Sequence, residues 1–237
     1  MKLGIFVYNF EHKKTQEGLL QLFLNGYKPT CIMAANPVKL NFYQSKIRIG
    51  FKDMKYLHPR DIAKKLDIPY YVVNHNEEEC IDVIKKYKLD LGIILGARIL
   101  KKPIIDSFNV GILNMHPGLL PQNRGLDNIK WAILDNIRQG VTTHLIDGAI
   151  DRGFLIDKKS VEVYRDDTLV DLTTRVQNLE LTMMIEAIEK IKNNDFSNKR
   201  IGIGKRNKSI PESIERHLME IFETYKENYR IKLRNDL

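Results

Sequence analysis

Short apolar runs alternate with segments of helical periodicity through the first two thirds of the sequence. The apolar runs are 3–7, 31–35, 70–74, 91–95 and 110–114, and the helical patterns between them are 15–25, 58–66 and 77–88. Apolar runs of about five residues fit buried strands, whereas apolar spacings of three and four fit helices packed on one side. This β-α-β-α order predicts an α/β fold in which helices flank a mostly parallel, Rossmann-like sheet, with ligands at the carboxyl ends of the strands.

The sequence beyond this region first continues the pattern and then changes. A helix is predicted over 127–136, and strands over 141–146 and 154–163. Asp166 or Asp167 can cap a long helix, and a second helix from Pro211 carries an apolar stripe of Ile214, Leu218, Ile221, Phe222, Tyr225 and Tyr229. We therefore expect an α/β domain over 1–165 and a helical C-terminal extension over 166–237, which packs on that domain and forms a homodimer through its helices.

The composition is that of an ordinary globular chain with excess positive charge. Hydrophobic residues make up 43 % of the 237 residues and charged residues 29 %, which excludes collagen-like and disordered classes. The net charge of +8 attracts anions but does not distinguish phosphate-bearing small molecules from nucleic acid. No apolar run has the roughly 18 residues of a membrane span, and no signal-peptide cleavage pattern follows the N-terminus, so we expect a cytoplasmic protein that binds no membrane.

The two cysteines give no sign of a metal or redox site. Cys31 and Cys80 lie within apolar stretches, without a CxxC partner or a nearby His at metal-ligand spacing. We expect both to be core residues, and we expect no metal site.

The segment 36–55 fits neither period and is rich in positive charge. Its basic residues are Lys39, Lys46, Arg48, Lys52 and Lys55. A loop of this length without secondary structure is uncommon and is usually functional or mobile. Two interpretations stay open: a solvated surface loop, or a clamp in which Lys46 and Arg48 contact a phosphate-bearing substrate.

The most informative stretch is NMHPGLLP, residues 114–121, directly after a buried strand. Asn114 and His116 are two residues apart, so strand geometry places their side chains on the same face. An amide beside an imidazole suits acyl chemistry, because the amide can donate to a developing oxyanion while the imidazole accepts a proton. The spacing alone is a weak signal, since polar residues at a strand end are often only structural.

A second group of polar residues follows in TTHLIDGAIDRG, residues 142–153. A carboxylate near His116 would orient the imidazole and favour its charged form, and Asp147 and Asp151 are both candidates on chemical grounds. His144 lies on a predicted strand, where a structural role is the commoner one.

These two stretches resemble the formyltransferases that use 10-formyltetrahydrofolate. The shared pattern is N-x-H-P-S/G-L-L-P after a strand and a later D-x-G, which here are 114–121 and 151–153. The resemblance implies Asn114, His116 and Asp151 as the catalytic set, in preference to Asp147, with Thr142 and His144 in supporting positions. It also implies that 10-formyltetrahydrofolate, the cosubstrate, contacts two segments: Leu95, Gly96, Ala97 and Arg98, and Ile146, Asp147, Gly148, Ala149 and Ile150.

The sequence departs from several branches of this family, and these departures narrow the choice of substrate amine. The purine-pathway enzymes carry a Gly-rich phosphate loop after the first strand, whereas residues 7–13 here read VYNFEHK. The sequence after Val163 predicts helices rather than the barrel domain of the methionyl-tRNA enzymes, and we expect no N-terminal regulatory domain of the formyl-folate hydrolases. The chain then resembles a short nucleotide-sugar N-formyltransferase, of the kind that serves lipopolysaccharide O-antigen biosynthesis.

This resemblance implies a nucleotide-linked amino sugar as substrate, with dTDP as the expected nucleotide. Arg124 matches an R-G that follows the LLP segment and is a candidate contact to sugar or pyrophosphate oxygens. Trp131 either packs against the sheet or shapes the sugar pocket. A glycinamide ribonucleotide or methionyl-tRNA substrate stays an alternative.

An alternative function of a different class is nucleic-acid binding. It is suggested by the basic residues Lys199, Arg200, Lys205, Arg206 and Lys208. It predicts affinity that falls steeply with salt and no folate dependence, and we expect no nucleic-acid partner.

Overall fold

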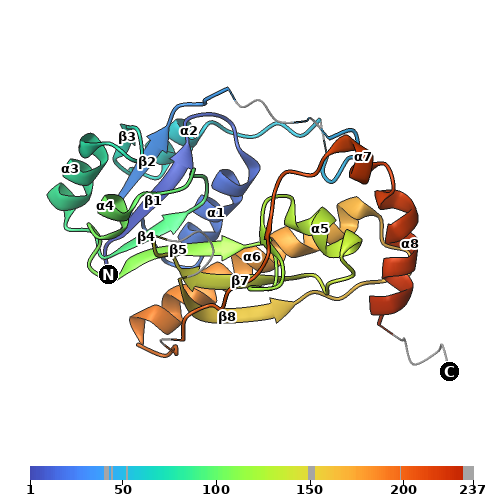
Figure 1. Ribbon diagram of the computed structural model, residues 1–237. Coiled ribbons are helices and arrows are strands. Elements are labelled where there is room, and N and C mark those ends of the chain that lie inside the picture. The colour runs from blue at the N-terminus through green and yellow to red at the C-terminus, as the bar shows by residue number, and fades with distance from the viewer. Residues whose placement is uncertain (40–42, 44, 52, 149–152, 198, 232–237) are drawn as a thin grey trace.

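The fold is built around a seven-stranded sheet in a computed structural model that describes residues 1–39, 43, 45–51, 53–148, 153–197 and 199–231 (Figure 1). The strands lie in the order β3-β2-β1-β4-β5-β7-β8. Their bounds are β1 Leu3–Tyr8, β2 Cys31–Ala35, β3 Tyr70–Val72, β4 Leu91–Ile94, β5 Gly111–His116, β7 Gly140–Leu145 and β8 Phe154–Ser160. The first five strands pair in parallel, and β7 and β8 add antiparallel strands at one edge, which confirms the mostly parallel, Rossmann-like sheet.

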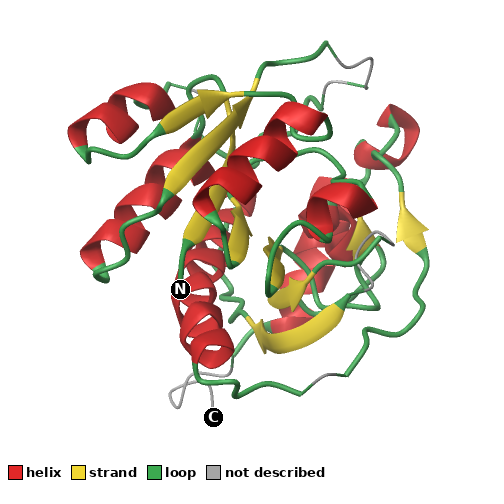
Figure 2. Cartoon of the chain, turned by 90° about the vertical axis from the view of Figure 1, so that its left-hand side faces the viewer, coloured by secondary structure: helices red, strands yellow, loops and turns green. Residues whose placement is uncertain are grey.

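Helices cover both faces of this sheet, as Figure 2 shows. Their bounds are α1 Lys13–Leu24, α2 Pro59–Lys65, α3 Glu78–Tyr87, α4 Lys102–Ile105, α5 Asn128–Leu134, α6 Leu169–Lys192, α7 Glu212–Glu215 and α8 Leu218–Tyr229. One core cluster joins the sheet to α1, α2 and α6, and a second joins the opposite face to α3 and α4. Because strand side chains alternate between faces, neighbouring β5 residues enter different clusters: Leu113 enters the first and Ile112 the second.

The long helix α6 belongs to the same core as the sheet. Met184, Ala187 and Ile188 pack in one cluster with Leu113 and Leu145 of the sheet. Its cap is not Asp166 or Asp167, as the sequence suggested. Thr168 caps the helix instead: its hydroxyl accepts from the Asp171 N–H while the Asp171 carboxylate accepts from the Thr168 N–H, so two free donors are satisfied together. Asp167 instead pairs with Arg175.

The expected helix from Pro211 is two helices, α7 and α8. At the break, the His217 N–H donates to the Ile214 carbonyl, three residues back rather than four, which tightens the chain. Most of the apolar stripe packs inside the subunit: Leu218, Phe222 and Tyr225 are buried in a third cluster with residues of α5 and α6. The stripe therefore does not supply the free apolar surface from which we predicted a homodimer, and the homodimer itself stays a prediction.

The loop between β2 and α2 crosses the molecule to the C-terminal helices (Figure 1). Its anchor is Glu215 of α7, which accepts hydrogen bonds from the Tyr43 hydroxyl, the Ser45 hydroxyl and the Lys46 N–H, and forms a buried ion pair with Lys130 of α5. Burial alone would raise the pKa of Glu215, but these hydrogen bonds and the ammonium group lower it to about 2. The loop is thus held by a buried charge.

The remaining expectations concern the membrane and the cysteines. Among the helices that the structure describes, none is long and apolar enough to cross a membrane. Cys31 and Cys80 are buried free thiols, as expected, and burial raises the pKa of each to about 12.

Candidate active site

Strand pairing places four of the polar residues of β5 and β7 opposite one another. In the antiparallel register Asn114 faces His144 and His116 faces Thr142. Directly opposed residues share a face of the sheet. Here it is the face opposite α6, because Leu113, Met115 and Leu145, which alternate with these residues along the strands, pack on the α6 side. The predicted same-face pair thus lies beside two residues of β7. We call the four side chains of Asn114, His116, Thr142 and His144 the polar square.

His144 fixes the orientation of the Asn114 amide. Asn114 Nδ2 donates to His144 Nε2 over 3.3 Å. His144 has no exposed surface, and burial, assisted by the nearby His116, lowers its pKa to about 3, so the ring is neutral and Nε2 can accept. Among the described residues the second hydrogen of the Asn114 amide has no protein partner, which leaves a donor for a bound oxygen.

His116 is held through one ring nitrogen by the backbone. Its Nε2 lies 2.8 Å from the Asn123 carbonyl oxygen, and His116 is only 4 % exposed. A carbonyl oxygen can only accept, so Nε2 carries the hydrogen in this contact. The Asn123 side chain is itself buried and donates to the Asn128 carbonyl, which ties this anchor to the start of α5.

Thr142 supports the loop that leaves β5. Its hydroxyl donates to the Gly118 carbonyl over 2.7 Å and accepts from the Leu120 N–H over 3.0 Å. This buried threonine therefore holds residues 118–120, the exit loop beyond His116.

The residues expected to bind the cosubstrate lie in two places. Leu95 and Gly96 donate their N–H groups to the Phe6 carbonyl, and the Ala97 carbonyl accepts from the Tyr8 hydroxyl. Arg98 lines cavities of about 510 and 270 Å³ beside the ends of β1 and β2. Ile146, Asp147 and Gly148 instead line a cavity of about 470 Å³ with Arg200, near the start of β5. Asp151, Ala149 and Ile150 lie outside the described residues.

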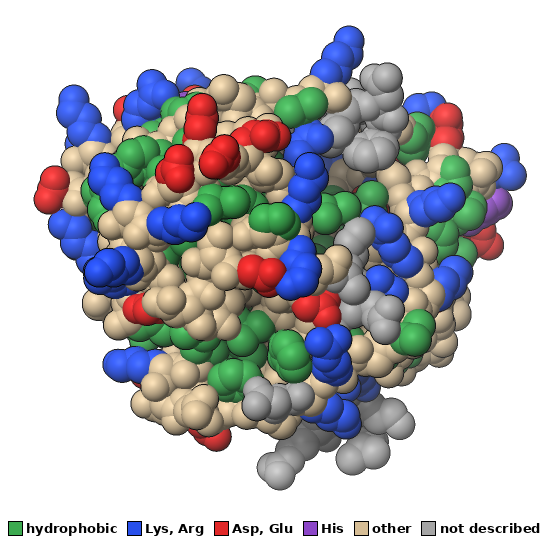
Figure 3. Space-filling model, turned by 60° about the vertical axis from the view of Figure 1, so that its left-hand side comes forward, with side chains coloured by type: hydrophobic (Ala, Val, Ile, Leu, Met, Phe, Trp, Pro, Cys, Tyr) green, Lys and Arg blue, Asp and Glu red, His purple; other side chains and the backbone are tan. Residues whose placement is uncertain are grey.

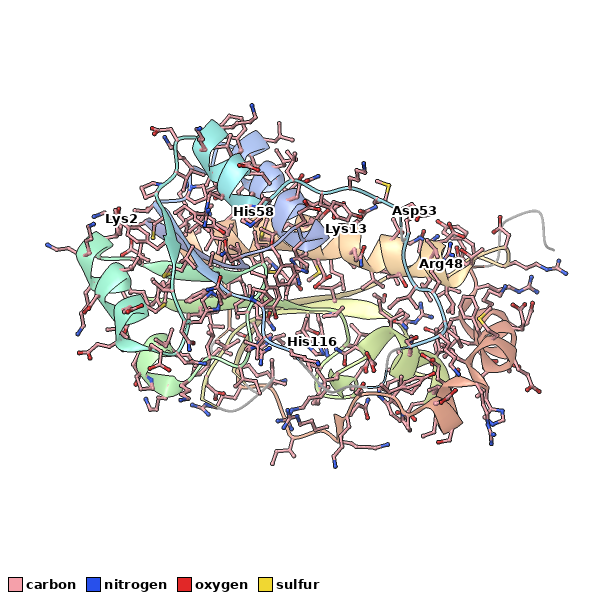
Figure 4. All side chains as sticks on the ribbon, turned by 90° about the horizontal axis from the view of Figure 1, so that it is seen from above. Lys2, Lys13, Arg48, Asp53, His58 and His116 are labelled. Atoms are coloured by element: carbon pink, nitrogen blue, oxygen red, sulfur yellow. The ribbon has the colours of Figure 1, made fainter. Side chains whose placement is uncertain are left out.

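The residues expected to bind the substrate come from three segments: the loop after β5, helix α5, and the loop between β2 and α2. Arg124 donates to the Gly204 carbonyl over 3.3 Å, and the Trp131 indole N–H donates to the Lys208 carbonyl over 2.8 Å. Both therefore contact the C-terminal segment, and the two interpretations of Trp131, packing on the sheet or shaping a sugar pocket, stay predictions. Lys46 pairs with Glu212, and Figure 4 shows Arg48 well separated from His116.

Two structural contacts at the site carry no sequence signal. Lys14 of α1 reaches the Met115 carbonyl, between Asn114 and His116, over 3.2 Å and pairs with the buried Glu180 of α6 over 2.6 Å. Asn123 acts through its backbone oxygen. Neither an isolated lysine in a helix nor a backbone carbonyl stands out in a sequence. No group of three His, Cys, Asp or Glu side chains within the described ranges could hold a metal ion.

Comparison with known proteins gives the family. The sequence profile described as formyl transferase matches residues 34–188, more than half of the chain. The methionyl-tRNA formyltransferase of Flavobacterium psychrophilum is 31 % identical over 140 residues, which cover 58 % of this chain and 44 % of the relative. The chain spans about half the length of the curated relatives it matches.

Solved structures share the fold. Glycinamide ribonucleotide transformylase 1 of Symbiobacterium toebii has a TM-score of 0.65 at 19 % identity, over 86 % of this chain and 94 % of that chain. A sugar N-formyltransferase from a Shewanella species has a TM-score of 0.61 at 19 % identity, over 100 % of this chain and 94 % of that chain. An N-formyltransferase of Helicobacter canadensis, solved with folinic acid and dTDP-3-aminofucose, has a TM-score of 0.61 at 20 % identity, over 99 % and 84 %. The profile match confirms the resemblance carried by residues 114–121, and the chain belongs to the formyl transferase family.

Proposed function

We propose that the protein transfers a formyl group from 10-formyltetrahydrofolate to the amine of a nucleotide-linked amino sugar. The observation that carries this proposal is the polar square on β5 and β7 of a formyl transferase family member: Asn114 oriented by a neutral His144, and His116 opposite Thr142. When bound, 10-formyltetrahydrofolate supplies a formyl carbon already activated toward attack by an amine. The available Asn114 donor and the His116 imidazole beside it fit that chemistry.

Each residue has a distinct task in the proposed transfer. The Asn114 amide donates its second hydrogen to the oxygen that becomes negative when the amine nitrogen bonds to the formyl carbon. His116 accepts the proton that the amine loses and returns it to the folate nitrogen as the bond between that nitrogen and the formyl carbon breaks. Asp151, which we assign by resemblance, holds His116 in place. Thr142 and Asn123 keep the loop and the ring fixed during the transfer.

The loop after β1 supports a sugar amine rather than glycinamide ribonucleotide. The end of β1 and this loop carry aromatic rings instead of glycines: Tyr8 and Phe10 stack with centroids 5.1 Å apart, and His12 packs edge-on to Tyr8 at 5.5 Å. A phosphate cradle needs free backbone N–H groups that a ligand can approach closely. The full-length match to the Shewanella sugar enzyme agrees with this choice, and the Helicobacter ligand supports dTDP as the nucleotide to test first.

The test is a product assay with several candidate amines. Purified protein with 10-formyltetrahydrofolate should form an N-formyl product with a dTDP-, UDP- or GDP-linked amino sugar, and a His116→Asn variant should not. Faster formylation of glycinamide ribonucleotide or of methionyl-tRNA than of every amino sugar would move the protein to that branch. Folate turnover with water alone would contradict a transferase.

The nucleic-acid alternative draws little support from the surface. On the face in Figure 3, Lys and Arg side chains are interspersed with Asp and Glu rather than gathered in one patch. Of the basic residues that suggested it, Arg200 pairs with Asp147 and Lys205 lies over the Trp131 ring. A titration with DNA and RNA at two salt concentrations separates the two functions, because phosphate binding weakens steeply with salt.

A further inference from the structure

The basic segment 199–210, which we call the strap, contacts two loops of the candidate site. It is the red coil that leads from α6 to α7 in Figure 1. In the sequence, this segment stood out only through the basic residues that suggested nucleic-acid binding. The strap instead runs along both the loop 117–127, which leaves β5, and the described ends of the turn that joins β7 to β8, residues 146–148 and 153–155, and it continues the hydrogen bonding of each.

The first half of the strap holds the turn between β7 and β8. The Leu155 N–H donates to the Lys199 carbonyl over 2.9 Å, and the Ile201 N–H donates to the Gly153 carbonyl over 3.0 Å. Between these bonds, the Arg200 guanidinium lies 3.3 Å from the Asp147 carboxylate and 5.0 Å from the centre of the Phe154 ring. Arg200 thus contacts Asp147 at one described end of this turn and Phe154 at the other. Asp147 is one of the residues that we expect to contact the cosubstrate.

The second half of the strap holds the loop that anchors His116. Strands β6 (Arg124–Gly125) and β9 (Arg206–Asn207) pair in parallel, and the Leu126 N–H donates to the Asn207 carbonyl over 3.1 Å. A Cβ at Gly204 would lie 1.9 Å from the Pro121 carbonyl oxygen, so the close approach requires glycine. This loop includes Asn123, whose carbonyl oxygen holds His116.

We propose that the strap is a positioning element for formyl transfer, which keeps the loop that anchors His116 and the described ends of the β7–β8 turn, where we expect the cosubstrate to bind, in one fixed relation. Arg200 and Gly204 are its positioning residues, one for each loop. Both loops flank β5 and β7 but lie at opposite ends of the antiparallel pair, and the strap joins them directly. The catalytic part of this proposal rests on the proposed function; the mechanical part does not.

The mechanical part is tested with a matched pair of glycine variants. Gly204→Ala places a methyl group against the Pro121 carbonyl, whereas Gly202→Ala meets only Pro121 Cγ at 3.7 Å, an ordinary contact. Both lose the same backbone freedom in the unfolded chain. In hydrogen exchange, Gly204→Ala should speed exchange by about tenfold or more at Leu126 and also at Leu155, in the other loop, and Gly202→Ala at neither. If Gly204→Ala changes Leu126 alone, the two loops are independent and the proposal fails.

The catalytic part is tested with a matched pair of charge variants. Arg200→Ala should raise the Kd for folinic acid, measured by calorimetry, about threefold to tenfold, the range for a partly exposed ion pair with a cation–π contact. Lys199→Ala, which removes an exposed charge one residue away, should leave the Kd unchanged, and Arg200→Lys should restore part of the loss. In kinetics, Arg200→Ala should raise the KM for 10-formyltetrahydrofolate and leave the KM for the amine unchanged.

The outcomes separate the two proposals. If the wild-type protein does not bind folinic acid, the proposed function fails, and the exchange experiment still decides whether the strap couples the loops. If the wild type binds folinic acid and Arg200→Ala binds it equally well, the positioning role of Arg200 is refuted while the proposed function stands.

Discussion

The buried His144 predicts a specific loss of stability in acid. Its ring is neutral in the fold, with the pKa lowered to about 3 by burial and by the neighbouring His116, whereas in the unfolded chain an imidazole titrates near 6.5. Below pH 6.5 the unfolded chain therefore binds a proton that the folded chain does not, and the free energy of unfolding falls as the pH falls. At pH 5 the difference is about 1.5 pH units at about 1.4 kcal/mol each, or about 2 kcal/mol.

The measurement compares the pH dependence of the wild type with that of His144→Asn. Urea denaturation at pH 8 and pH 5 gives the loss of unfolding free energy for each protein, and the variant, which has no imidazole here, should lose about 2 kcal/mol less. If His144→Asn and the wild type lose equal amounts, His144 is not held neutral in the fold, and its role as an acceptor for Asn114 is refuted.

Three further predictions concern the site, the loop anchor and assembly. His116→Asn should lower kcat by about two to four powers of ten and Asn114→Ala by about two to three, as for other acid-base groups and oxyanion donors, and a fall below tenfold in steady-state kinetics would contradict these roles. Glu215→Gln should cost about 3 kcal/mol in urea denaturation because it leaves the buried Lys130 ammonium without its counter-ion, while Asp106→Asn, in an exposed pair, should cost under about 1 kcal/mol; equal effects would contradict the anchor. Light scattering at micromolar concentration should give twice the chain mass of 27.6 kDa for the predicted homodimer, and a mass of one chain would contradict it.

Local pattern was enough to predict most of the architecture. The strand Cys31–Ala35 has the bounds that its apolar run indicated, and Gly26 follows the first helix with the positive φ of +79° that such an end favours. The shared face of Asn114 and His116 was predictable as well, because it needs only the two-residue period of one strand. Each of these features depends on residues close together in the chain, where steric and hydrogen-bonding preferences act directly.

The tertiary structure decided which residues meet. Asn114 and His144 are 30 residues apart, and their contact depends on the register of β5 against β7, which no single strand specifies. The aromatic stripe of the C-terminal helix shows one apolar face in sequence, but periodicity cannot say whether that face packs on its own subunit or on another. The contacts of the strap were the hardest to predict from sequence. They depend on backbone carbonyls and on a glycine that has no room for a methyl group, and neither can be recognised from residue types. The sequence by itself thus determined the elements and the chemistry available on β5, and only long-range packing brought His144, Asn123 and Arg200 around it.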